Sequence, residues 1–334
     1  MEIKVLGIDI AKRVFQLHGV DAKGKVALKK RLPRHQLLNF MAHLPPCLIG
    51  IESCGGAHYW ARQFQTYGHE VKLVPPQYVK PYVKTNKNDA NDAEAICEAV
   101  SRPNMSFVSI KSVAQQDIQS LHRFRQRVVQ QRTALVNQIR GLLTEYGIVI
   151  SQGIGHIRKV LPQILENQEG DLTSLALEVF HDLHQELLSI DEKVKSLDKS
   201  LNQLCQKIEA CQRIQQVEGI GPLTATALVA AIGDVSHFKN GRHLAAWLGL
   251  VPRQYSSGNR QVLLGISKRG DRYLRTLLIH GARAFISLAK KRSTWLEKLI
   301  KRCGKQKAYV ALANKNARVV WALLAKQSVY QSAH

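Results

Sequence analysis

Apolar residues in the first hundred positions form short runs, each of which stops at a charged or turn-forming residue. Runs of this length indicate strands, and the helical spacing of the segments between them indicates helices. The pattern predicts an α/β domain. The strands are expected at 3–9, 14–20, 25–32, 47–52 and 71–74, and the helices at 35–43, 57–67 and 89–100.

The middle of the chain changes to a helical pattern. A long helix rich in Gln and Arg is expected at 115–146, and apolar residues after position 175 recur at spacings of four and three. This spacing, sustained over about five heptads, predicts a coiled coil. Glycines 153, 155 and 170 mark a loop between the two helices, so an intramolecular hairpin and an intermolecular dimer both remain open. The heptad residues are Ala176, Phe180, Leu183, Leu187, Ile190, Val194, Leu197, Leu201, Leu204, Ile208 and Cys211.

The last third of the chain also has helical spacing, with helices expected at 223–232, 271–290 and 307–326. The predicted fold class is therefore α/β plus α. Three domains are expected: an α/β domain at 1–110, a long helical coiled-coil connector at 111–212 and a mostly helical domain at 213–334.

The balance of charge narrows the function. Lysine and arginine outnumber the acidic residues by 48 to 25, which gives a formal net charge of +23. The segment 251–307 alone carries 15 basic and two acidic residues, so more than half of the excess lies in about a sixth of the chain. A patch this one-sided is typical of a nucleic-acid surface, because it displaces counterions from phosphates.

A membrane partner is not expected from the sequence. The longest strongly apolar stretch, 225–232, is far shorter than the ~20 residues of a spanning helix. The chain begins as a strand rather than as a signal peptide, and its six cysteines include no Cys-x-x-Cys pair. These observations predict reduced cysteines and a cytoplasmic, nucleoid-associated protein.

Four carboxylates stand out by position. Asp9 ends the first predicted strand and Glu52 ends the fourth, whereas Asp89 and Asp92 lie three apart on one face of a helix. Taken singly, each is typical of a strand end or a solvated helix face. Gathered together, they repel one another unless a cation lies between them. Oxygen ligands favour Mg²⁺, with Mn²⁺ as a substitute, and such a site can act on a phosphodiester.

Two further motifs lie in the basic C-terminal part. The turn Gly219-Ile220-Gly221-Pro222 fits a helix-hairpin-helix, whose backbone N–H groups contact DNA phosphates. A Ser-Gly pair follows at Ser257-Gly258, and serine becomes a nucleophile where cations neutralise its target phosphate. The candidate nucleic-acid-binding residues are Gly219, Gly221, Arg253, Arg260, Lys268, Arg269, Arg272 and Arg275.

These motifs, in this order, resemble those of the DEDD-type insertion-sequence transposases. The match extends over nearly the whole chain. The motifs are Gly7-Ile8-Asp9, Ile51-Glu52-Ser53, Asn88-Asp89-Ala90-Asn91-Asp92, and the segment from Gly219 through Ser257-Gly258 to Arg275.

The resemblance implies an RNase H-like (RuvC-like) mixed-sheet domain, a coiled-coil connector and a C-terminal transposase domain. It gives metal-binding and catalytic roles to Asp9, Glu52, Asp89 and Asp92. It makes Ser257 the residue that forms a phosphoserine link to DNA, although the neighbouring Ser256 keeps that assignment open.

The resemblance also implies partners. They are the DNA of the element ends and of the target, a structured guide RNA, and further copies of the chain in a dimer or tetramer joined through the coiled coil. The expected activity is that of an RNA-guided recombinase that cleaves and rejoins DNA.

Three other interpretations follow from the residues. A metal-dependent junction endonuclease would use the four acids alone, with Ser257 structural. A basic architectural protein would need neither the acids nor the serine. An actin-like ATPase would explain the early Gly-Ile-Asp, but Ile10-Ala11-Lys12 stands where its glycine-threonine phosphate turn belongs.

Overall fold

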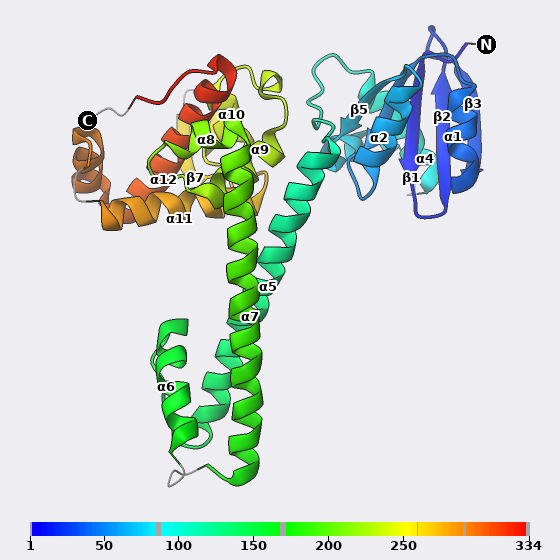
Figure 1. The fold of residues 1–334 in the computed structure, drawn as a ribbon. Coiled ribbons are helices and arrows are strands. Elements are labelled where there is room, and N and C mark those ends of the chain that lie inside the picture. The colour runs from blue at the N-terminus through cyan, green and yellow to red at the C-terminus, as the bar shows by residue number, and fades with distance from the viewer. Residues whose placement is uncertain (1, 85–87, 168–171, 259, 290–291, 332–334) are drawn as a thin grey trace. The chain divides into compact units, whose positions relative to one another are not determined.

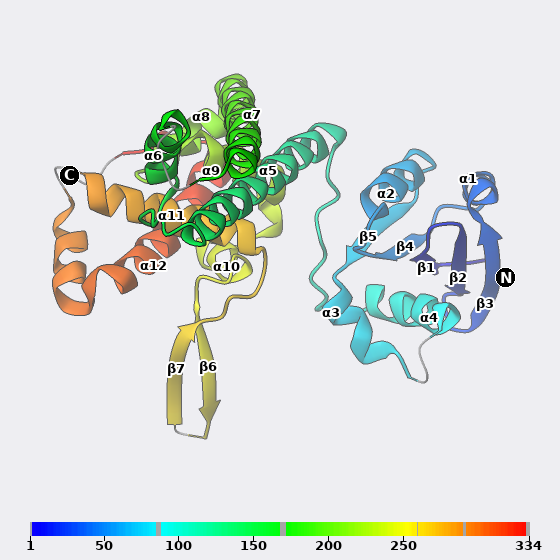
Figure 2. The ribbon, with the colours of Figure 1, turned by 90° about the horizontal axis from the view of Figure 1, so that it is seen from below.

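The computed structural model describes residues 2–84, 88–167, 172–258, 260–289 and 292–331 (Figures 1 and 2). The chain forms two compact units, Met1–Ala114 and Gln115–His334. Among the described residues, no helix has both the length and the apolar character needed to cross a bilayer.

The first unit is built on a five-stranded mixed sheet of order β3-β2-β1-β4-β5. Strand β1 pairs antiparallel with β2 and parallel with β4, and β4 pairs parallel with β5. The prediction of an α/β domain with these strands is confirmed. The elements are β1 (Val5–Ile10), β2 (Val14–Val20), β3 (Val26–Pro33), α1 (Arg34–Ala42), β4 (Leu48–Glu52), α2 (Ala57–Thr66), β5 (Glu70–Val74), α3 (Pro76–Val79), a 3₁₀ turn (Lys80–Tyr82) and α4 (Asp89–Val100).

Alternation along the strands separates the two faces of this sheet. Leu6 and Ile8 of β1 belong to the core cluster that includes α1 and α2, and Ile49 and Ile51 of β4 join it there. Since successive side chains point to opposite faces, Gly7 and Asp9 lie on the other face, which α4 covers. Figure 2 shows the sheet between α4 on one side and α1 with α2 on the other.

Helix α4 rests on a pair of glycines. Gly7 of β1 and Gly50 of β4 are partners in the parallel register. A Cβ atom on Gly7 would lie 2.2 Å from the carbonyl oxygen of Ala93, and one on Gly50 would lie 2.8 Å from Cβ of Val100. Only glycine permits this approach, so these two positions fix how closely α4 packs on the sheet.

In its described residues, the second unit is helical apart from one two-stranded hairpin. The predicted helices at 115–146, 223–232 and 271–290 appear with small changes of boundary. The elements are α5 (Val113–Thr144), α6 (Ile154–Glu166), α7 (Ser174–Lys207), α8 (Glu209–Gln215), α9 (Pro222–Ile232), a 3₁₀ turn (Val235–His237), α10 (Gly241–Trp247), β6 (Pro252–Ser257), β7 (Arg260–Ile266), α11 (Arg272–Leu288) and α12 (Thr294–Lys326).

Helices α5 and α7 pack against each other within one chain, antiparallel. Arg132 pairs with Asp191 at 3.2 Å and Arg125 pairs with Asp198, so one helix ascends as the other descends. Val128, Val194 and Leu197 form a small core between them. The intramolecular hairpin, one of the two arrangements that the heptad pattern left open, is therefore present (Figure 1).

The connector differs from the sequence prediction in two places. The heptad pattern extended to Cys211, but α7 ends at Lys207 and Ile208 is extended, so Cys211 belongs to α8. The expected loop at Gly153 and Gly155 is mostly helix α6, whose Ile157 and Leu161 pack in the core formed by the ends of α5 and α7. Gly170 lies outside the described residues.

A buried histidine of α5 forms hydrogen bonds to two of the C-terminal helices. His122 is 3% exposed, and its ring nitrogens lie 3.0 Å from the Tyr273 hydroxyl of α11 and 3.0 Å from the Thr226 hydroxyl of α9. Thr226 donates its own proton to the carbonyl of Pro222 at 2.8 Å, so its oxygen accepts from Nε2–H of His122. Nδ1 then accepts from Tyr273, and the ring is neutral.

We expect this histidine to make the stability of the protein depend on pH. Burial lowers the pKa of His122 to about 4 from an ordinary 6.5, so the folded state disfavours the charged form. The contribution of the neutral ring to the free energy of unfolding is complete above pH 6.5 and is lost as pH falls toward 4. At its largest, this contribution is on the order of 3 kcal/mol. Between pH 7 and 4.5 the melting temperature of His122→Gln should fall less than that of the wild type. Parallel curves would contradict this, and exposed His181→Gln is the control.

We also expect the glycine pair under α4 to be intolerant of a side chain. Gly7→Ala would force a Cβ into the Ala93 carbonyl, and overpacking of this kind costs about 1–3 kcal/mol. The first thermal transition of the full chain should move several degrees lower. Gly55→Ala is the matched control, because a Cβ there meets nothing within 4 Å. Equal melting curves for both variants would show that α4 does not depend on this contact.

Candidate active site

Three of the four predicted acids come together at the C-terminal end of the central strand β1 in the first unit. Asp9 lies near the end of β1, and Asp89 and Asp92 lie in the first turn of α4. One carboxylate oxygen from each lies within 4.8 Å of those from the other two. The Asn88 side chain caps the helix by accepting from the backbone N–H of Asn91, which fixes where this first turn begins.

The close packing of α4 on Gly7 explains why the three aspartates lie together. Asp9 lies two residues beyond Gly7 on the same face of β1, and α4 approaches that face without an intervening side chain. The first turn of α4 therefore lies over the end of β1. The N-terminal end of the helix dipole also favours the negative charges of Asp89 and Asp92.

Glu52 lies outside the group of three but close to it. It is the last residue of β4 and comes directly after Ile51, whose partner in the parallel register is Ile8, so Glu52 and Asp9 are the next residues along two neighbouring strands. Alternation places it on the face that α4 covers. Burial first, and then the charges of Glu52 and Asp9, raise the pKa of the Cys54 thiol, so both carboxylates lie near that one sulfur.

The donor set fits a hard divalent cation. Like charges within 4.8 Å repel by on the order of 1–3 kcal/mol per pair in a half-solvated site, and a bound cation would turn this cost into attraction. The oxygens come from aspartates alone, without histidine or cysteine in the group, which is typical of Mg²⁺ or Mn²⁺ rather than zinc. The arrangement is a candidate metal site.

The predicted serine lies on the β6–β7 hairpin of the second unit. Ser257 ends β6, Arg260 begins β7, and Gly258 between them has φ of +53°, which favours glycine. The hairpin projects from the helical body, and every described residue of β6 is exposed (Figure 2). Ser256 and Ser257 are therefore both open to solvent.

The register of the hairpin separates the two serines. Ser257 is opposite Arg260 and Tyr255 is opposite Val262, whereas Ser256 is opposite Gln261. Residues directly opposite share a face, so Ser257 lies on the face that carries Arg260 and Tyr255, and Ser256 lies on the other. Ser257 is thus the serine with an arginine as its cross-strand neighbour.

The predicted basic residues do not share one environment. Arg253, Arg260, Lys268, Arg269 and Arg272 are exposed, on the hairpin, in the loop that leads to α11 and at the first residue of α11. Arg275 differs from the prediction because it is 9% exposed. Its Nη1 donates to the carbonyls of Leu248 at 3.1 Å and Arg269 at 3.0 Å, so its guanidinium holds the loop in place and does not present itself to a phosphate.

The two glycines of the predicted DNA hairpin have different surroundings. Gly219 has φ of +83°, and its backbone packs against Gly281 of α11, where a Cβ would lie 2.9 Å from a carbonyl oxygen. The close packing against Gly281 is therefore enough to explain why position 219 is a glycine, without a contact to DNA. Gly221 caps α9, and a Cβ there would meet nothing within 4 Å, so the start of this helix is open.

Sequence reasoning missed the hairpin itself. The sequence predicts a turn at Ser256-Ser257-Gly258, without strands on either side. The signal was present in the Gln261-Val262-Leu263-Leu264 run after the turn, whose β-branched and apolar residues favour a strand. The exposure of Tyr255 (77%) and Leu263 (69%) explains why no buried alternation revealed it.

The sequence of the chain matches those of transposases. Residues 6–148 match a family model for the IS110 DEDD protein, described as a transposase, and residues 211–296 match the model of the transposase IS116/IS110/IS902 family. The first match contains Asp9, Glu52, Asp89 and Asp92, and the second contains Ser257.

Relatives of nearly the same length are similar over the whole chain. The transposase for insertion sequence element IS1111A of Coxiella burnetii is 49% identical, over 99% of this chain and 92% of that protein. A probable family 20 transposase of Pseudomonas aeruginosa is 47% identical, over 99% of both chains. The transposase for IS1328 of Yersinia enterocolitica is 38% identical, over 98% of both. The chain belongs to the IS110 family of insertion-sequence transposases, and the resemblance to DEDD transposases is confirmed at this level.

We expect the three-aspartate group to bind a divalent ion that Mn²⁺ reports. Asp9→Asn and Asp92→Asn should each weaken binding at least tenfold, because each removes a charged ligand. Glu52→Gln should have a smaller effect, since Glu52 lies outside the group. Titration of the full chain with Mn²⁺, followed by the electron paramagnetic resonance of the free ion, measures this. Glu70→Gln removes a distant acid as the control; if it weakened binding as much as Asp9→Asn, the site would be wrong.

Proposed function

We propose that this transposase breaks and rejoins DNA through a serine nucleophile assisted by a metal-bound acidic site. The observation that carries the proposal is that one chain contains both a candidate metal-binding acidic site and an exposed serine beside an arginine. The first unit carries Asp9, Asp89 and Asp92 close together, with Glu52 at the end of the neighbouring strand β4. The second unit carries Ser257 on an exposed hairpin, opposite Arg260.

The N-terminal unit suits the metal-binding half. Its strand order, with β1 at the centre and an acid at the end of β1, supports an RNase H-like domain. Asp9, Asp89, Asp92 and Glu52 would hold Mg²⁺, or Mn²⁺ in its place. The ion, when bound, supplies a Lewis acid that neutralises charge on a phosphodiester. The acids themselves position that ion near the backbone of the DNA.

The β6–β7 hairpin supplies the nucleophile that forms the covalent bond to DNA. The oxygen of Ser257 attacks phosphorus, a P–O bond to the serine forms, and the P–O bond to one sugar breaks. The serine proton leaves to a base, and the departing sugar oxygen takes up a proton to become a hydroxyl. Attack by another sugar hydroxyl reverses these changes, so the energy of the phosphodiester is conserved. Arg260, which shares a face with Ser257, would bind the charged phosphate.

The surrounding cations suit DNA. Arg253, Lys268, Arg269 and Arg272 are exposed near the base and along the length of the hairpin. The open start of α9 at Gly221 would add backbone N–H groups for a phosphate, as in a helix-hairpin-helix. Together they would hold the element ends and the target without reading their sequence.

We further propose that the active site is composite and that a guide RNA selects the DNA. Acids from one protomer would meet the serine of another in a dimer or tetramer, with the long α5 and α7 helices as the contact. Support for the RNA comes from membership of the family and from the large positive charge.

The test is the covalent intermediate. With Mg²⁺, element-end DNA and co-expressed RNA, wild-type protein should form a protein–DNA adduct that survives denaturation. Ser257→Ala should lose the adduct and keep DNA binding, and Ser256→Ala, on the opposite face, should keep both. If Ser257→Ala cleaved DNA at the wild-type rate with free ends, the metal-dependent endonuclease would be the better account.

A further inference from the structure

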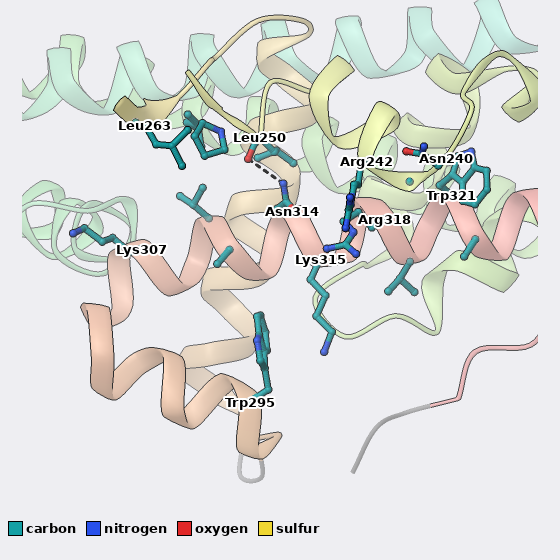
Figure 3. Close-up of a pocket in the computed structure, with 18 of the residues that line it drawn as sticks. Asn240, Arg242, Leu250, Leu263, Trp295, Lys307, Asn314, Lys315, Arg318 and Trp321 are labelled. Atoms are coloured by element: carbon teal, nitrogen blue, oxygen red, sulfur yellow. Dashed lines mark hydrogen bonds between the residues drawn. The ribbon is translucent and has the colours of Figure 1, made fainter. Parts of the chain in front are cut away.

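A large groove lies along α12 in the second unit, bounded by β7 and α10 (Figure 3). We call it the α12 groove. Its volume is about 1630 Å³, which exceeds the ~300–1000 Å³ of ordinary small-molecule sites. None of the residues assigned above to metal binding, the serine chemistry or DNA contact lines it. The groove is therefore a separate feature that needs its own explanation.

The charge of the α12 groove has one sign. Arg242 of α10 and Lys307, Lys315 and Arg318 of α12 line it, and the lining residues that the structure describes include no acid. Within the described part of the chain, none of these four cations takes part in a salt bridge. Such a surface is complementary to a polyanion.

An aromatic ring lies among these cations. Trp295 is 42% exposed, and Nζ of Lys315 lies 4.5 Å from its ring centroid. The ammonium group of Lys315 therefore lies over one face of the indole, so that an aromatic ring and a cation are paired in the groove lining. Trp321, also in the lining, is fixed as a wall because its Nε1 donates to the Phe238 carbonyl at 2.8 Å. The small apolar side chains of α12 complete the floor.

The spacing of the cations suits a chain rather than a single group. Lys307 and Arg318 are 11 positions apart on α12, which corresponds to about 16 Å along the helix axis. Lys315 lies between them in sequence, on the same lining face. Phosphates repeat every few ångströms along a nucleic-acid strand, so several could be bound at once.

We propose that the α12 groove binds an unpaired nucleic-acid strand, with its phosphates on Arg242, Lys307, Lys315 and Arg318 and a base stacked on Trp295. A duplex keeps its bases stacked inside, where an indole in a groove does not reach them. A single strand offers both its phosphates and the faces of its bases. The strand would be either displaced DNA or RNA, which share this chemistry.

The position of the groove also relates it to the hairpin. Leu263, Leu264 and Ile266 of β7 form part of its rim, and β7 begins at Arg260, opposite Ser257. A strand that leaves the groove along β7 would therefore pass toward the tip of the hairpin. Nevertheless, the groove can bind a strand whether or not Ser257 is a nucleophile, so the two proposals can fail separately.

The test measures binding in the full chain carrying Ser257→Ala, so that no adduct can contribute. The probes are a fluorescein-labelled 16-nucleotide single-stranded DNA, the RNA of the same sequence, and the DNA duplex, followed by fluorescence anisotropy. Lys315→Ala with Arg318→Ala removes two groove charges. Lys298→Ala with Lys301→Ala removes two charges from exposed residues of α12 outside the groove and is the matched control.

We expect the groove variant to weaken binding of a single strand at least tenfold more than the control does. Each lost phosphate contact should also lower the slope of log K against log salt by about 0.7, and so by about 1.4 for the pair. Trp295→Ala should weaken single-strand binding about 5- to 100-fold. Stronger binding of DNA would identify a displaced strand as the source, and stronger binding of RNA would identify an RNA partner; either result supports the groove.

Tryptophan emission provides a second measurement. Adding oligo(dT) should quench emission, and Trp295→Phe should retain binding while losing most of the quench. Trp247→Phe, outside the groove and 37% exposed, should keep both. The proposal is overturned if the groove and control pairs weaken single-strand binding equally. It is also overturned if the groove pair weakens duplex binding as much as single-strand binding, or if the quench survives in Trp295→Phe.

Discussion

The close packing of α4 on the paired glycines of β1 and β4 is the contact on which the metal-binding half depends. Gly7 and Gly50 leave room for the helix backbone itself, so its first turn lies over the end of β1. Any side chain at Gly7 would move Asp89 and Asp92 away from Asp9. The site is therefore a property of sheet packing as much as of the acids, and a cation would offset the repulsion that this packing creates.

The second unit follows a different principle. Its helices form a well-packed body, in which His122, Thr226 and Tyr273 join α5, α9 and α11 by buried hydrogen bonds. The chemically interesting residues lie outside this body, on an exposed hairpin and in a basic groove. A two-stranded ribbon on its own is only marginally stable in water, so the stability of this hairpin depends on its attachment to the helical body.

Much of the fold could be predicted from the sequence, and the reasons for the exceptions are physical. The strands of the first unit were predictable because buried alternation ends at recognisable turns. The proximity of Asp9 and Glu52 was harder to predict, because it depends on the parallel pairing of β1 with β4, and the local sequence pattern does not specify that pairing. Arg275 was predicted to contact nucleic acid because it belongs to the dense run of basic residues after the serine, whereas here its guanidinium is buried and donates to two backbone carbonyls. The break after Lys207 and the α12 groove arise from tertiary packing and have no local signature.

The central claim is that the acids of one protomer and the serine of another act on a single phosphate. Mixing two inactive proteins tests it most directly. Asp9→Asn supplies an intact Ser257, and Ser257→Ala supplies intact acids, so a mixed oligomer contains one complete site. The account predicts that each variant alone forms no covalent protein–DNA adduct and that the equimolar mixture recovers adducts, carried only by the Asp9→Asn chain. A mixture as inactive as its components, or adducts on the Ser257→Ala chain, would contradict it.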